Sequence, residues 1–107
     1  MSLERLTEIT SSAPARFFGI AGRKGKIEVG MDADFAVVDE NEEWTVRAAD
    51  LHYLNRYTPL EGRELVGRVM ATILRGEVVF SRIGDGGEKF GVPGYGQWVR
   101  RETRVEP

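Results

Sequence analysis

The sequence predicts a mainly β fold of the α+β class, with short helices at the N-terminus and a β-hairpin near the C-terminus. Apolar residues recur at helical steps of three, four or seven positions only in the first part of the chain. After that part, β-branched and aromatic residues gather in short runs separated by glycine and proline. The chain has 107 residues, 41% of them hydrophobic and 30% charged, which is typical of one soluble globular domain.

Two short helices are expected at the N-terminus. The residues at helical spacing are Leu3, Leu6, Ile9, Ala13, Phe17 and Ile20. Ser11, Ser12 and Pro14 interrupt this pattern, because serine favours a helix cap and proline is tolerated only in the first helical turn. The second helix is expected to end at Gly19 or Gly22, since glycine readily adopts the left-handed conformation of a C-cap.

The next part of the chain has the composition of strands. We expect a first strand at Ile27 and Val29, then a turn at Gly30–Asp32, and further strands at Phe35–Val38 and Trp44–Val46.

The clearest expected element is a β-hairpin. Leu65–Leu74 and Glu77–Phe80 are rich in β-forming residues, and Arg75 and Gly76 between them predict a tight turn. Residues 48–63 have no regular period and predict a loop over a sheet edge. From residue 83 onward the chain is dense in glycine, which predicts another loop.

Four carboxylates lie close together in the sequence: Glu28, Asp32, Asp34 and Asp39. A calcium loop would alternate oxygen ligands, but Phe35–Val38 fills positions that should carry oxygen. Consecutive strand residues also face opposite sides, which keeps Asp32, Asp34 and Asp39 from converging on one ion. We therefore expect Asp32 and Asp34 to cap turns through backbone N–H groups, with Gly30 supplying a permissive backbone angle.

No other motif predicts a catalytic site. His52 is the only histidine, and without cysteine it cannot build a zinc site of three or four ligands. Asp50 is near enough to orient His52 as a general base, but a histidine in a polar loop is usually just solvated. The glycines at positions 84, 86, 87, 91, 94 and 96 fit neither a P-loop nor a dinucleotide fingerprint. Tyr95 and Trp98 are expected to cover the core rather than a partner surface.

Charge and composition argue against several classes of partner. The 15 basic and 17 acidic residues leave a net charge of -2, which does not favour nucleic acid or an anionic membrane. No apolar run reaches the roughly 20 residues of a membrane helix, and the N-terminus lacks the apolar region of a secretory signal. The absence of cysteine fits a reducing compartment, so a cytoplasmic location is expected.

Three stretches of the sequence carry a family resemblance: SSAPARFFGIAGRKGKIEVGMDADFAVVD, EEWTV with RYTPLEGRELVGRVMATILRGEVVF, and FGVPGYGQW. Together they resemble the C-terminal part of cyclic amidohydrolases, which include allantoinases, dihydropyrimidinases or hydantoinases, and dihydroorotases. The first stretch is similar to the passage where the last barrel helices lead into a β-sandwich. The second is similar to the closing strands of that sandwich, and its amino-acid sequence is most similar to that of allantoinases.

The resemblance implies a composite β-sandwich domain without the TIM barrel of these enzymes. It divides the chain into short helices at residues 1–22 that match the last barrel helices, a sandwich segment at residues 23–98 and a charged tail at residues 99–107. The metal ligands of the family are an HxH pair, a lysine that is often carboxylated, two further histidines and an aspartate, and none has a counterpart here. We therefore expect no catalytic, cofactor-binding or metal-binding residue in this chain, although zinc is expected in the full-length parent.

Two functional hypotheses remain open. The chain is either a C-terminal segment of a metal-dependent hydrolase of cyclic amides, where it supports an active site it does not contain, or a stand-alone binding or assembly module without catalytic activity. In the family, the missing barrel portion and the N-terminal strands would be its partners. Without them the chain has an unpaired strand edge and an apolar helix face, and we expect it to form a homodimer.

Overall fold

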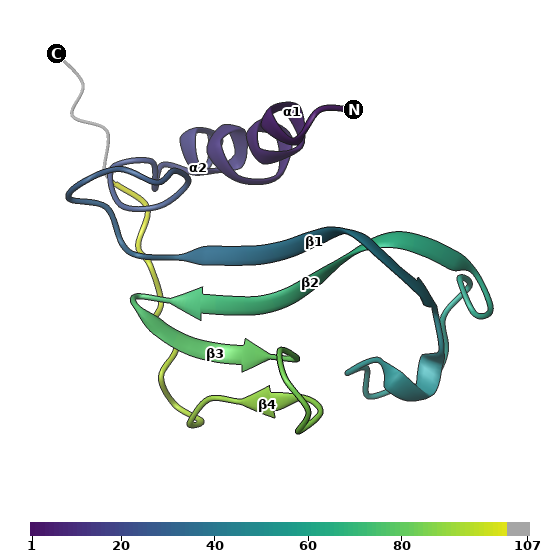
Figure 1. Cartoon of the computed structure of the whole chain (residues 1–107). Coiled ribbons are helices and arrows are strands. Elements are labelled where there is room, and N and C mark those ends of the chain that lie inside the picture. Colours follow the sequence, from purple (N-terminus) through teal and green to yellow (C-terminus); the bar gives the residue numbers. More distant parts are fainter. Residues whose placement is uncertain (103–107) are drawn as a thin grey trace, which may run out of the picture.

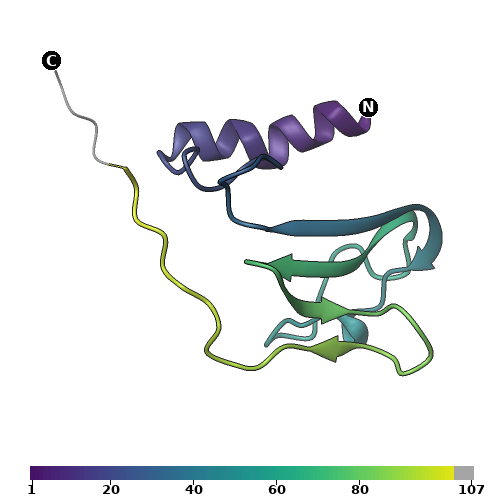
Figure 2. The same ribbon diagram turned by 60° about the vertical axis from the view of Figure 1, so that its left-hand side comes forward.

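The computed structural model describes residues 1–102, so the last five residues of the expected charged tail lie outside the described part. A helical rod lies beside one edge of a four-stranded antiparallel sheet (Figure 1, Figure 2). The strands follow one another in the order β1-β2-β3-β4. This arrangement confirms the mainly β, α+β prediction. Within residues 1–102 there is a single β layer and no α/β barrel, so the second layer of a sandwich is not among the described residues.

The two predicted helices are joined into one rod. Helix α1, Leu3–Thr7, continues through a π-helical turn, Glu8–Ser12, into helix α2, Ala13–Phe17, and Figure 2 shows them as one continuous element. The predicted interruption therefore widens the helix instead of breaking it. Its physical cause is Pro14, which has no N–H to bond the carbonyl of Thr10 and whose ring would crowd that carbonyl in a regular α-helix.

The ends of the rod follow the expected cap chemistry. At the start, the hydroxyl of Ser2 accepts a hydrogen bond of 3.1 Å from the N–H of Arg5. At the other end, Gly19 adopts a left-handed φ of +76°, which confirms the first of the two predicted end points. The rod is then fastened to the following loop, because the hydroxyl of Ser11 donates to the carbonyl of Gly25 at 3.1 Å.

The strand expected at Ile27 and Val29 is wrong. Both residues lie in a loop, with side chains 82% and 103% exposed. The N–H of Asp32 donates to the carbonyl of Arg23 at 3.1 Å, which folds this segment back on itself instead of leaving it extended. No neighbouring strand among the described residues pairs with it. The expected permissive angle at Gly30 is confirmed by its φ of +92°.

Strand β1, Phe35–Thr45, combines two segments that the sequence predicts as separate strands. It pairs antiparallel with β2, Glu64–Leu74, from Phe35 opposite Ile73 to Thr45 opposite Glu64. The pairing shifts between Asp39 and Glu43, which is where the sequence leaves its gap between strands. β1 is an edge strand, and its outer side faces the helical rod (Figure 1).

The predicted hairpin is confirmed. Strand β3, Glu77–Ser81, returns alongside β2 directly after Arg75 and Gly76. Between β1 and β2, the expected loop contains a short 3-10 helix, Ala48–Asp50. Strand β4, Lys89–Phe90, is not predicted, because two residues inside a glycine-rich loop carry no periodic signal.

Replacing Gly76 by valine is expected to lower the free energy of unfolding by about 1 kcal/mol or more. Gly76 has a φ of +83° and Arg75 a φ of +45°, a left-handed pair typical of a two-residue hairpin turn. A Cβ at position 76 would meet no atom within 4 Å, so the cost comes from the backbone angle. Urea denaturation measures the effect. The matched control is Gly96→Val, whose site is equally open but lacks a left-handed φ, and equal losses in both variants would contradict the turn assignment.

The described residues enclose very little core. The buried apolar residues are Ala15, Val46 and Ala71. The accessible surface is 8859 Å², whereas a compact monomer of 12.0 kDa exposes about 6,000 Å². The radius of gyration is 16.4 Å, against about 13 Å for a compact domain of this length. The fold is thus more open than that of a self-sufficient domain. None of its helices in residues 1–102 is long and apolar enough to cross a membrane.

Candidate functional site

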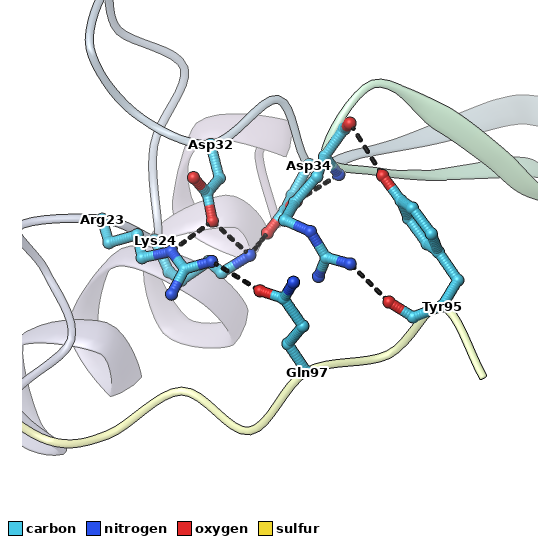
Figure 3. A network of polar contacts seen from close by, with 7 residues as sticks. Arg23, Lys24, Asp32, Asp34, Tyr95 and Gln97 are labelled. Carbon is cyan, nitrogen blue, oxygen red and sulfur yellow. Dashed lines mark hydrogen bonds and ion pairs between the residues drawn. The ribbon is translucent and has the colours of Figure 1, made fainter.

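The acidic cluster folds into an ion-pair network (Figure 3). The ammonium nitrogen of Lys24 lies 2.8 Å from Asp32 Oδ2 and 2.5 Å from Asp34 Oδ2. Arg23 Nε lies 2.6 Å from the same oxygen of Asp32. The Lys24 side chain is only 13% exposed, so its charge is held between the two carboxylates. A protein cation therefore stands where a metal ion would have to bridge Asp32 and Asp34.

The same network ties the hairpin turn to the C-terminal segment (Figure 3). The second oxygen of Asp34 accepts a 2.9 Å hydrogen bond from the backbone N–H of Arg75. The guanidinium of Arg75 lies 4.4 Å from the ring centroid of Tyr95 and donates to the Tyr95 carbonyl, and the Tyr95 hydroxyl donates back to the carbonyl of Arg75 at 3.0 Å. Arg23 also donates to Gln97 Oε1 at 3.3 Å. Three segments distant in sequence are thereby fastened together.

The predicted turn-capping role is correct for only part of the cluster. Asp34 caps a backbone N–H, although that N–H belongs to the hairpin turn and not to its own turn. Asp39 caps the N–H of Asn41 at 2.9 Å. The prediction is wrong for Asp32, whose carboxylate bonds to the cations of Arg23 and Lys24, because two flanking positive charges outcompete a backbone amide.

The remaining carboxylate of the cluster, Glu28, pairs with Lys26 at 2.8 Å on the surface. Residues 1–102 contain no group of three histidine, aspartate or glutamate side chains placed to hold a metal ion. The ion-pair network is therefore structural, and we call it the clamp. Its members are Arg23, Lys24, Asp32 and Asp34.

The clamp shifts two pKa values in opposite directions. The hydrogen bond from Lys24 lowers the pKa of Asp32, and Arg23 adds to this effect, against a smaller rise from desolvation. Desolvation lowers the pKa of Lys24, but its hydrogen bonds and its attraction to Asp32 and Asp34 together outweigh that and raise the pKa above 10.5. Both shifts favour the charged pair in the folded chain.

The clamp is expected to make stability fall at both ends of the pH range. The pKa of Asp32 is lower in the folded state, so its contribution is present above about pH 4 and is lost as the pH falls through the folded value. The pKa of Lys24 is higher in the folded state, so its contribution is lost as the pH rises through that value, above about 10.5. Urea midpoints measured from acid to alkaline pH should show a plateau between these limits.

Asp32→Asn should lower that plateau and flatten its acid side. The matched control is Glu28→Gln, which removes a surface ion pair with Lys26 and should leave the acid side unchanged, because exposed pairs contribute little. An acid side as steep in Asp32→Asn as in the unmodified chain would contradict the role given to Asp32.

The other candidate residues are dispersed. His52 is 59% exposed, as expected for a solvated histidine, and its partner is Glu88 at 3.2 Å rather than Asp50. Tyr95 packs against Arg75 of the hairpin turn. Trp98 is 81% exposed, so the expectation that it covers the core is wrong. The C-terminal segment that follows β4 is extended and runs away from the sheet (Figure 2).

One pocket has no counterpart in the sequence-based predictions. It has a volume of about 240 Å³ and is lined by two arginines, Arg68 and Arg82, together with Trp44 and His52. The guanidinium carbon of Arg68 lies 4.7 Å from the ring centroid of Trp44, and that of Arg82 lies 5.0 Å from the ring of Phe80. The sequence signal that could have found it is an arginine inside the apolar run of β2.

Comparison with known proteins identifies the family. The model of the Amidohydrolase family matches residues 1–80, which is most of the chain. The chain belongs to this family. It is 48% identical over 97 residues to an allantoinase of Rubrobacter xylanophilus and 38% identical over 103 residues to an L-hydantoinase of Paenarthrobacter aurescens. These alignments cover 91% and 96% of the chain, which confirms the resemblance to cyclic amidohydrolases.

Solved structures agree with the sequence matches. The whole chain superposes on a dihydropyrimidinase from Brevibacillus agri with a TM-score of 0.84 and 33% sequence identity. The chain spans only 22% of that structure, and 20% of the Rubrobacter allantoinase. It therefore corresponds to a part of these enzymes. The family's zinc does not fit the residues present, because the chain has one histidine and no metal-binding group within residues 1–102.

Proposed function

We propose that the chain is the C-terminal β-rich segment of a metal-dependent cyclic amidohydrolase of the allantoinase or hydantoinase type, which hydrolyses a C–N bond of a cyclic amide. In this role it supports an active site formed by residues outside it. The observation that carries the proposal is the superposition of the entire chain on about a fifth of a dihydropyrimidinase.

The open surface supports this role. The chain exposes about 2,900 Å² more than a compact monomer of its mass, and part of that surface belongs to the extended segment after β4. Apolar side chains of the rod contribute to it, among them Phe17 at 79% and Phe18 at 63% exposure. A helix normally buries its apolar stripe against another layer. We assign residues 1–22 to contact with the catalytic barrel and residues 23–98 to the β-sandwich.

The clamp has a place in this function. Arg23, Lys24 and Asp34 lie between the rod and the sheet in sequence, and their contacts fix the loop that joins the two. A fixed loop sets the position of the rod relative to the sheet, and hence the position of the barrel that the rod would contact. We place the enzyme in the cytoplasm, in keeping with a chain that has no cysteine.

A chimera tests the proposal. The matching fifth of the Rubrobacter allantoinase is replaced by this chain, which is 48% identical to it. We expect a soluble protein that hydrolyses allantoin with added zinc at a rate within about tenfold of the parent, since packing tolerates substitutions that keep volume and pattern. The parent without its own segment should be insoluble or inactive, because a large apolar surface is then exposed.

A second chimera is the control for specific packing. It carries Phe17→Asp and Phe18→Asp at the end of the rod, which place charges on exposed apolar surface assigned to the barrel contact. This chimera should lose most of its soluble, active protein. A first chimera that folds but is inactive, or a second chimera as active as the first, would contradict the proposed role.

A further inference from the structure

We propose that the pocket between Arg68 and Arg82 binds a small oxyanion, with the carboxylate or phosphate group held by both guanidinium groups. Arg68 lies on β2, and Arg82 directly follows β3. The N–H of Arg82 donates to the carbonyl of Met70 at 2.9 Å, just after β3 ends. Arg68 lies two residues before Met70 on β2, so the two arginines are diagonal neighbours on one face of the sheet.

Both arginines have buried donors without an acceptor. The Nε atoms of Arg68 and Arg82 are inaccessible to solvent and have no hydrogen-bond partner. Among the described residues, no carboxylate lies within 4 Å of either guanidinium group. Buried donors are normally satisfied, and two adjacent positive charges repel each other. An anion in the pocket would balance the two charges.

The nearest acidic residues do not fill this role. Asp39 is the register partner of Arg68, but its Oδ1 accepts a hydrogen bond from the N–H of Asn41. Asp50 lines the pocket and is exposed. His52 is the other titratable group in the pocket wall, and it pairs with Glu88.

The shape of the pocket favours an oxyanion. Trp44 lies against Arg68 and Phe80 against Arg82, which holds each guanidinium in place. A fixed guanidinium presents two N–H groups in a fork that matches two oxygens of a carboxylate or phosphate. The volume of about 240 Å³ suits a small ligand. This inference does not depend on the proposed function, since the pocket is formed entirely by the described chain.

Nuclear magnetic resonance of the arginine Nε–H groups tests the proposal on the full chain. Sodium acetate, sodium malonate and sodium phosphate serve as probes, each titrated at constant ionic strength set with sodium chloride. We expect the Nε–H signals of Arg68 and Arg82 to move together and to saturate in the millimolar range with at least one probe. Shifts that stay linear and unsaturated with all three would overturn the proposal.

Single substitutions show whether the pocket is the site. Arg68→Gln and Arg82→Gln should each weaken binding at least tenfold, and Arg68→Lys should weaken it too, because lysine keeps the charge but loses the fork. The matched control is Arg100→Gln. Arg100 also lies over an aromatic ring, that of Trp98 at 5.0 Å, but outside the pocket, so binding should be unchanged. Loss of binding in all variants alike, or in none, would overturn the assignment.

Two further variants test whether the chain supplies its own anion. Asp39→Asn and Asp50→Asn should leave the Nε–H signals of the anion-free chain in place. A large shift of both arginine signals in either variant would show that a carboxylate of the chain already occupies the pocket, and would overturn the proposal. Because Asp39 and Asp50 are exposed, these variants remain folded even if an arginine variant does not.

Discussion

The purified chain is expected to hydrolyse neither allantoin, hydantoin, dihydrouracil nor dihydroorotate, with or without added zinc. Hydrolysis of a cyclic amide by this family's chemistry needs a metal-bound hydroxide, and a catalytic zinc takes three protein ligands. The chain has one histidine and no cysteine. The carboxylates of Asp32 and Asp34 are paired with Arg23 and Lys24.

The expected difference is large, because enzymes accelerate reactions by about 10⁶-fold or more and none of that acceleration should remain. Product formation is measured over hours at high protein concentration, with the Rubrobacter allantoinase as the positive control. Turnover that requires zinc and that follows the chain through two chromatography steps would contradict the prediction. If the chimera folds and is active with zinc while the isolated chain is inactive, the inactivity of the chain comes from its missing metal site and not from misfolding of the segment.

Elements fixed by local chemistry were predictable from the sequence. The hairpin of β2 and β3 is specified by β-forming strands and by Gly76, which fits the left-handed angle of its turn. The end of the rod at Gly19 and the permissive angle at Gly30 follow from the same property of glycine. Each of these signals lies within a few residues of the structure it specifies.

Elements that depend on distant partners were not predictable. Ile27 and Val29 have strand composition, but a strand needs a neighbour, and the described chain offers them none. β4 consists of two residues whose pairing is set by β3. The π-helical turn depends on the conflict between Pro14 and the carbonyl of Thr10. The spacing of apolar residues gives no information about that pair.

Only the acidic half of the clamp could be predicted from the sequence. The carboxylates of Asp32 and Asp34 were clear from the sequence. Their partners Arg23 and Lys24 stand eight to ten residues earlier in the chain, a spacing that fits no helical or strand rule for ion pairs. The contribution of Tyr95 comes from 20 residues beyond Arg75 and depends on the path of the C-terminal segment.

The isolated chain is expected to form a homodimer of about 24 kDa at micromolar concentration, twice its mass of 12.0 kDa. We propose this association for the chain when the rest of the enzyme is absent. A stable protein interface buries roughly 800 Å² on each partner. The surface that the chain exposes beyond that of a compact monomer is about 2,900 Å², which exceeds this requirement.

Two surfaces on one side of the molecule are available for the contact. A groove of about 560 Å³ separates the rod from β1, and Leu3, Leu6 and Val38 are among the residues that line it. Their exposed fractions are 54%, 43% and 49%. β1 is also an edge strand, and an open edge is a template for another strand. A second copy could cover both features, either by pairing along the edge or by exchanging rods.

Light scattering combined with size-exclusion chromatography decides the question. A mass near 12 kDa across the micromolar range would contradict the dimer. Val38→Lys should shift the equilibrium toward the monomer, because a charged residue on an edge strand opposes strand addition and Val38 also lines the groove. The matched control is Tyr57→Ser, which removes an apolar side chain of 73% exposure from the loop between β1 and β2. Since Tyr57 does not line the groove, its loss should leave the dimer intact, and equal dissociation of both variants would place the interface elsewhere.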